Sequence, residues 1–208
     1  MPNISDLLST NTANIATNTT AVANAGGAWE LVSTTEVTSN VSSVDFTGLA
    51  TGYLYKVIFQ NVKHPVGIGS KYVQLRWMNG TSAYADGIYH YGGFRQAADN
   101  SVSGKAQSGQ VSAHFFRCYW TSSGGRDGVN GEVTIYNMGV SGRHIALSSL
   151  LVNSLSSAYS ATGAFNCGVF GNGSSTYDAG NIDGIRMMLQ DSTNIAAGTF
   201  TLLKGSLT

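Results

Sequence analysis

The fold class is decided by the stretch YLYKVIFQNV at residues 53–62, in which apolar residues recur at every second position from Tyr53 to Phe59. Successive side chains of a β-strand point to opposite sides, so this period of two predicts a strand with one buried face. The stretch KYVQLRWM at residues 71–78 repeats the pattern. The apolar positions of the two stretches are Tyr53, Tyr55, Val57 and Phe59, then Val73, Leu75 and Trp77.

Nine further stretches carry the same signal and are separated by turns rich in Gly, Asn and Ser, such as GIGS, MNGTS and GNGSS. They are 29–38, 41–47, 86–95, 111–121, 131–138, 143–153, 164–170, 182–190 and 199–204. About eleven short strands at this spacing predict an all-β fold, an antiparallel β-sandwich or jelly roll, over residues 29–208. No helix is expected after residue 25.

The composition agrees with an all-β domain and argues against several partners. Of 208 residues only 11% are charged, the net charge is zero, and the chain has three Glu and five Lys. Nucleic-acid binding needs an excess of basic residues, so no nucleic-acid partner is expected. No apolar run reaches the length of a membrane span, and the N-terminus MPNISDLL does not resemble a secretory signal. Cys118 and Cys167 are expected as buried free thiols, with a disulfide as the alternative.

Residues 1–25 differ from the rest, because they contain no Gly and no aromatic residue. The pair Gly26-Gly27 breaks this pattern, so residues 26–28 are expected to be a linker. Within 1–25, six positions follow the alternating four-three spacing of a coiled-coil seam. They are Ile4, Leu8, Asn11, Ile15, Asn18 and Val22. The spacing predicts a short trimeric coiled-coil helix that precedes the β domain; another kind of helix or a disordered arm are the alternatives.

Two Asn at one seam position specify the register and the oligomeric state of a coiled coil and do not add stability, because a buried amide is costly unless it is paired. Here each Asn is followed by Thr, in LSTNT and IATNT. These segments resemble the apolar-x-x-Asn-Thr layers in the stalks of trimeric autotransporter adhesins and phage fibres. The resemblance implies a homotrimer in which Asn11 and Asn18 converge on the axis, where such layers commonly hold an anion.

The β domain begins with WELVSTTEVTSNVSSVDFTGL and ends with IDGIRMMLQDSTNIAAGTFTLLKG. Over residues 29–65 and 182–205 this order resembles a β-sandwich domain that recurs in virion proteins of tailed phages, especially phages of aquatic bacteria. Leu203-Lys204 stands where that pattern usually has Tyr. The resemblance implies a component of the virion surface, made in the host cytoplasm, that contacts other virion proteins. It carries no active site.

No constellation of residues points to catalysis, a metal or a cofactor, so none of the three is expected. The four His, at 64, 90, 114 and 144, form no HExxH motif, and no CxxC occurs. The acidic residues are spread thinly, and a glycosidase needs two carboxylates close together. The segment YDAGNIDG at 177–184 has the wrong spacing for a calcium loop and is expected to be a turn. Gly198 is expected to mark the turn before the last strand.

One aromatic cluster leaves the function open between two classes. Tyr84, Tyr89, Tyr91 and Arg95 would stack on a host surface glycan if they were exposed, whereas strand core and inter-subunit packing are the alternative. The first hypothesis is a structural, non-enzymatic phage protein, a trimeric capsid decoration, cement or head-fibre knob. The second is a small tail fibre or receptor-binding tip that recognises a host glycan. A β domain by itself suits both.

Overall fold

The computed structural model describes residues 29–65, 71–84, 89–96, 102–110, 112–118, 128–141, 145–153, 164–170 and 179–206. The expected helix at 1–25 and the linker at 26–28 lie outside these residues, and both stay predictions. The described part is all-β, with its strands in two antiparallel sheets. Its helical elements are two short 3-10 turns, η1 (Ala179–Asn181) and η2 (Gln190–Ser192).

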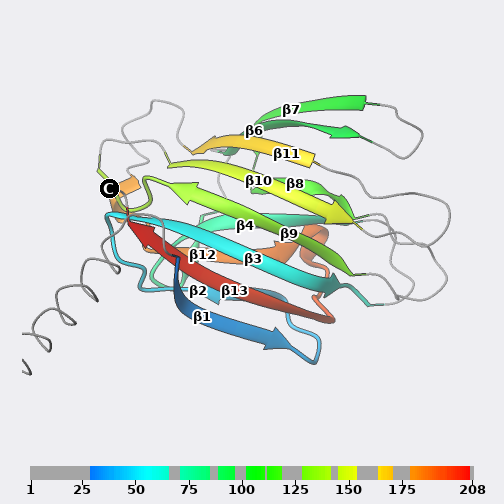
Figure 1. Ribbon diagram of the computed structural model, residues 1–208, viewed down its shortest axis with the longest axis horizontal. Helices are drawn as coiled ribbons and strands as arrows, with labels where there is room; N and C mark the ends of the chain where they lie inside the picture. The colour runs from blue at the N-terminus through cyan, green and yellow to red at the C-terminus, as the bar shows by residue number, and fades with distance from the viewer. Residues whose placement is uncertain are drawn as a thin grey trace, which may run out of the picture.

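The larger sheet has eight strands, in the order β1-β13-β3-β9-β10-β11-β6-β7. Their bounds are β1 Glu30–Val37, β13 Ala197–Ser206, β3 Tyr53–Lys63, β9 Val129–Tyr136, β10 Ile145–Asn153, β11 Ala164–Phe170, β6 Tyr89–Gln96 and β7 Val102–Gln110. The start of β1 and the end of β13 lie side by side at one end of the domain, where Glu30 is opposite Lys204 (Figure 1). The chain therefore enters the described domain next to its last strand.

The smaller sheet has five strands and lies behind the larger one in Figure 1. Its strands are β2 Ser43–Phe46, β12 Gly184–Leu189, β4 Lys71–Asn79, β5 Ser82–Ala83 and β8 Ala113–Cys118. The outer strands β5 and β8 both pair with β4, at its end and at its beginning. Between those two stretches a side chain from the larger sheet reaches the β4 backbone, as described below.

The pairing is nested along the chain. β1 pairs with β13, β2 with β12, β3 with β9, and β4 with β8. The intervening strands β10, β11, β6 and β7 extend the larger sheet past β9. All eleven stretches expected from alternation contain a strand, which confirms the all-β antiparallel class. β5 and β7 were not expected.

The core lies between the two sheets and is built by the alternating positions that the sequence marks. Each sheet contributes a row of fully buried side chains, since one face of every central strand is turned inward. The row comprises Val57, Phe59, Phe200 and Leu202 from the larger sheet, and Leu75, Trp77, Ile185 and Met187 from the smaller one. Rings also meet within the larger sheet, where the centroids of Phe59 and Phe200 are 6.4 Å apart.

Gly198 lies inside β13, opposite a bulge of β3 that contains Asn61 and Val62, and not in a turn before the strand, which corrects the expected position. The register between β13 and β3 shifts between Ala197 and Thr199. Gly198 has a φ of +140°, and a Cβ there would lie 2.9 Å from the Cα of Val62. Glycine is required because both the dihedral angle and the close approach of β3 exclude a side chain.

Candidate functional site

The outward side of the larger sheet carries an apolar surface at the end where β1 begins. Among the described residues, the large hydrophobic side chains that stay exposed are Trp29, Leu31, Val32 and Tyr136, with exposed fractions of 36%, 60%, 40% and 37%. All four belong to this end of the sheet. Together with the half-buried Leu54 and Leu203, we call them the Trp29 face.

Strand register explains why residues far apart in the sequence meet on this face. Leu31 lies opposite Leu203, and Gly205 lies opposite Leu54. The buried neighbours of Leu54 and Tyr136, Tyr55 and Ile135, are opposite each other, so Leu54 and Tyr136 share the outward side. Val32 is the extra residue of a bulge between Leu31 and Ser33, which adds a further apolar side chain to β1.

The Trp29 ring lies against the sheet because Gly205 has no side chain. A Cβ on Gly205 would be 3.3 Å from the indole ring, so the ring occupies the space that a larger residue would fill. The ammonium of Lys56 lies 4.9 Å from the centroid of the same ring, a cation–π distance. Contacts with the Gly205 backbone and with the Lys56 ammonium thus hold the Trp29 ring in place.

The basic groups at this end have acidic partners within the chain. Lys56 Nζ lies 3.3 Å from a carboxylate oxygen of Glu132, and Lys204 Nζ lies 3.2 Å from Glu30. Lys204 also lies 5.1 Å from the ring centroid of Tyr53. These partly exposed ion pairs add little stability, but they make this end of the domain close to neutral.

The other half of the same outward surface is polar. Thr34 and Thr201 lie opposite each other with their hydroxyl oxygens 3.4 Å apart. Thr199 lies opposite Glu36 on one side and the exposed Gln60 on the other. Among the described residues, the exposed large apolar side chains are therefore confined to the end of the sheet that adjoins residue 29.

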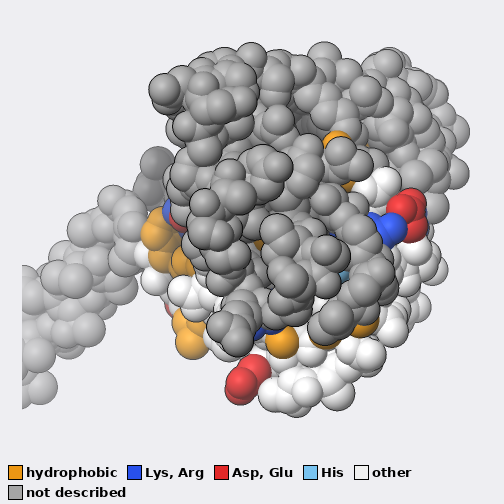
Figure 2. All heavy atoms as spheres, turned by 90° about the vertical axis from the view of Figure 1, so that its right-hand side faces the viewer, with side chains coloured by type: hydrophobic (Ala, Val, Ile, Leu, Met, Phe, Trp, Pro, Cys, Tyr) orange, Lys and Arg blue, Asp and Glu red, His pale blue; other side chains and the backbone are white. Residues whose placement is uncertain are grey.

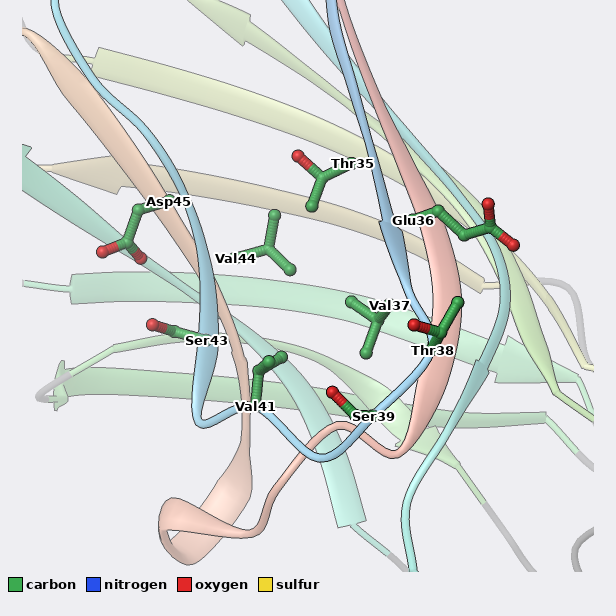
Figure 3. A pocket seen from close by; sticks show the side chains of 9 residues that line it. All are labelled: Thr35, Glu36, Val37, Thr38, Ser39, Val41, Ser43, Val44 and Asp45. Carbon is green, nitrogen blue, oxygen red and sulfur yellow. The ribbon is translucent and has the colours of Figure 1, made fainter.

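A hollow of about 220 Å³ opens between the edge strands β1 and β2. Figure 3 shows its lining side chains, which are Thr35, Glu36, Val37, Thr38, Ser39, Val41, Ser43, Val44 and Asp45. Val37 and Val44, 5% and 4% exposed, belong to the core. The rim is hydroxyl-rich, and in Figure 3 its two carboxylates, of Glu36 and Asp45, point to opposite sides. This arrangement suits hydrogen bonding to a small polar group and does not pair the two acids.

Asp45 is engaged by Arg186 from the neighbouring strand. Arg186 Nε and Nη2 donate to the two carboxylate oxygens at 2.8 and 2.6 Å, a bidentate pair between directly opposed residues. The hydrogen bond to Asp45 raises the pKa of Arg186, although partial burial opposes the shift. The pair ties β2 to β12.

A second hollow, of about 360 Å³, is lined by Asn79, Ser82, Ala83 and Tyr84 next to the β4–β5 turn. It lies beside the aromatic cluster that the sequence offered as a glycan site. Tyr89 is only 2% exposed, so its ring cannot stack on a sugar, and it drops out of that site. Tyr84 is half-buried and packs against the core. The side chains of Tyr91 and Arg95, on β6, lie outside the described residues.

The Tyr89 hydroxyl forms hydrogen bonds with backbone groups in and beside the smaller sheet instead. It accepts a hydrogen bond from the backbone N–H of Trp77 and donates one to the carbonyl oxygen of Tyr84, both at 2.9 Å. On β4 the pairing with β8 ends at Leu75, and the pairing with β5 begins at Met78. The hydroxyl therefore bridges the gap between these two ladders, which makes Tyr89 a core residue, as the alternative interpretation held.

Of the four histidines, His64 is the one whose side chain the structure describes. It is 5% exposed, and its Nδ1 donates to the carbonyl oxygen of Pro65 at 2.6 Å. Burial lowers the pKa of His64 below its ordinary value, more than this hydrogen bond raises it. Within the described residues no group of three or more His, Cys, Asp and Glu could hold a metal ion.

The remaining expectations divide between described and undescribed residues. The described end of the YDAGNIDG segment is a turn, in which an Asp183 carboxylate oxygen accepts the N–H of Gly80 at 2.8 Å. The seam residues Ile4, Leu8, Asn11, Ile15, Asn18 and Val22 lie outside the described residues. Cys118 and Cys167 lie on strands of different sheets, and their side chains are outside the description too. Among the described residues, no helix has the length and hydropathy that crossing a membrane requires.

No family model, curated protein or solved structure matches this chain. The Trp29 face is the feature that residue-by-residue inspection of the sequence missed. Its signal was present in WELVSTTEV, where the adjacent Leu31 and Val32 cannot both point inward from a regular strand.

Proposed function

We propose that this chain is a structural, non-enzymatic protein of a bacteriophage particle. In this proposal it forms a homotrimeric decoration, cement or head-fibre knob at the virion surface, and it contacts other virion proteins. It is made in the host cytoplasm. The resemblance of residues 29–65 and 182–205 to a virion β-sandwich domain, and of the Asn-Thr layers to phage-fibre stalks, is the sequence support.

The nested pairing of strands supports the architectural part of the proposal. Pairing the first strand with the last, the second with the last but one, and so inward is the winding of a jelly roll, a form common in capsid and lectin domains. β10, β11, β6 and β7 then add to one sheet of that core. A fold alone does not assign a function, because function depends on the surfaces that the fold presents.

The Trp29 face is the observation that carries the proposal. Its exposed apolar side chains lie at the end of the domain where the chain leads back to the expected coiled-coil seam. A contiguous apolar surface on a small domain marks a protein contact. Figure 2 views the domain from the end opposite to the start of β1, where the described charged side chains are of both signs.

A small tail fibre or receptor-binding tip for a host glycan is the second candidate. The hollow beside Tyr84 favours it, because Asn79, Ser82 and Tyr84 place amide, hydroxyl and aromatic groups around one opening. Such groups bind sugars by hydrogen bonds and ring contacts. The loss of Tyr89 to the core weakens this candidate relative to the first.

Location and copy number on the particle test the proposal. We expect immunogold labels against this chain to cover the head of the virions that encode it, and quantified gel bands to show many copies per particle. Labels confined to the tail, with only a few dozen copies or fewer, would refute the decoration role and favour the fibre. Absence of the chain from purified virions would refute both.

A further inference from the structure

The Trp29 face has the composition of an interface core on an otherwise polar sheet surface. Leu31 is 60% exposed, although it is a large aliphatic side chain on a strand. The neighbouring aromatic rings, Trp29 and Tyr136, are also more than a third exposed. Since the far half of the same surface carries Thr, Gln and Glu, exposure of apolar groups is concentrated and not scattered.

The length of chain before the domain suggests which partner covers this face. Seven peptide steps join Val22, the last expected seam position, to Trp29. Fully extended, they reach no more than about 25 Å. A domain of this size is roughly 40 Å across. If three chains meet in the seam, the end of each domain that holds Trp29 must therefore lie near the common axis, while the far end need not.

The charges of the face fit contact between identical copies. Close to a three-fold axis, the same residue of each copy approaches its equivalents, so an unpartnered charge there would repel itself. Here Lys56 is paired with Glu132, and Lys204 with Glu30, within one chain. Three such faces can approach one another, because each basic group is already neutralised by an acidic partner in its own chain.

We infer that the Trp29 face is the contact by which the β domains of three copies pack around their common axis. Leu31, Val32 and Tyr136 are its central apolar contacts, and Trp29, held over Gly205, forms its edge beside the stalk. This inference rests on the homotrimer of the proposed function, and it adds where on the β domain the copies meet.

The test compares the full-length chain with Leu31→Glu and Tyr136→Glu, each of which places a charge on the face. Gln60→Glu is the matched control, because Gln60 is exposed on the polar half of the same sheet. Light scattering at a series of micromolar concentrations measures the mass, and circular dichroism measures folding. We expect three times 21.8 kDa for the unchanged chain and for the control. For each face variant we expect the dissociation midpoint to move to at least tenfold higher concentration, with the β spectrum retained.

A second pair of measurements covers a variant that fails to fold. Leu31→Ser removes the same apolar surface without adding a charge. A photo-crosslinking residue at position 31 should join copies, with the crosslinks mapping to residues 29–34, 54, 134–136 or 201–205 of the neighbouring chain. Crosslinks that map to β7 or to the smaller sheet would overturn the inference.

The outcomes separate this inference from the proposed function. An unchanged chain that is a trimer, with face variants that remain trimers of equal stability, would overturn the inference and leave the trimer standing. A chain that is monomeric at every concentration would overturn both, and it would point to another virion protein as the partner of this face. A dimer that Leu31→Glu splits would keep the face as the contact between copies and refute the three-fold arrangement.

Discussion

The hydroxyl of Tyr89 offers the sharpest test of how the two sheets are joined. Tyr89→Phe removes one oxygen atom and leaves the buried ring in place. That oxygen accepts the N–H of Trp77 and donates to the carbonyl of Tyr84, at the point where β4 changes partner from β8 to β5. No water takes its place readily, because Tyr89 and Trp77 are 2% and 0% exposed.

The magnitude follows from the two backbone groups that lose this partner. Leaving a buried donor or acceptor unsatisfied costs about 1–3 kcal/mol. The carbonyl of Tyr84 is closer to solvent, so we expect a loss of about 2–4 kcal/mol in the free energy of unfolding. For a protein of this length each kcal/mol lowers the melting temperature by about 2–4 °C. Urea titration at 25 °C and fixed protein concentration measures the effect directly.

Tyr53→Phe is the matched control, because it removes the same atom from a half-buried ring that is not part of the Trp29 face. Among the described residues the Tyr53 hydroxyl replaces no partner in a strand ladder, so its loss should cost less than about 0.5 kcal/mol. If Tyr89→Phe were as stable as this control, the hydroxyl would not complete the β4 ladder. The aromatic cluster would then have to be reconsidered as a binding site.

Three further changes test other parts of the molecule. Burial lowers the pKa of folded His64 below 6.5, so the unfolded chain takes up the proton first as the pH falls. The free energy of unfolding should therefore fall as the pH drops below about 6.5. Urea titrations of His64→Gln between pH 7.5 and 5.5 should show a weaker dependence of this free energy on pH. Gly198→Ala should lower the free energy of unfolding by about 1–3 kcal/mol. Gly48→Ala should lower it less, because Gly48 shares a positive φ but has open space around it. Equal losses would contradict a close contact between Gly198 and Val62. Replacing Asn11 and Asn18 together by Ile should raise the melting temperature but broaden the distribution of oligomers by light scattering, and a cleanly trimeric, less stable variant would remove these residues from the seam.

The strands that alternation predicted are those with one face in the core. In β3, β4 and β12 the marked positions Val57, Trp77 and Ile185 are each 0% exposed. β7 was missed because its sequence, VSGKAQSGQ, has no alternation of apolar residues. Among the described strands it is the last of the larger sheet and pairs with β6, whose backbone hydrogen bonds hold it in place.

The candidate sites were harder to predict, because exposure is a property of the assembled sheets. Tyr84 and Tyr89 are close in sequence and look alike as binding residues. Tyr84 lines a hollow, whereas the Tyr89 side chain reaches through the core to β4. The Trp29 face joins residues of β1, β3, β9 and β13, from Trp29 to Leu203. No local pattern links positions so far apart.

The sequence by itself determined that this chain forms short antiparallel strands with one apolar side each, because the period of two is a local property of the extended backbone. It also marked residues 1–25 as a different kind of segment through their composition. Only the tertiary structure decided the nested order of strands, the role of the Tyr89 hydroxyl, and the end of the larger sheet where apolar side chains stay uncovered. These depend on which distant strands become neighbours, and that choice is made by the packing of the whole core and not by any single stretch of sequence.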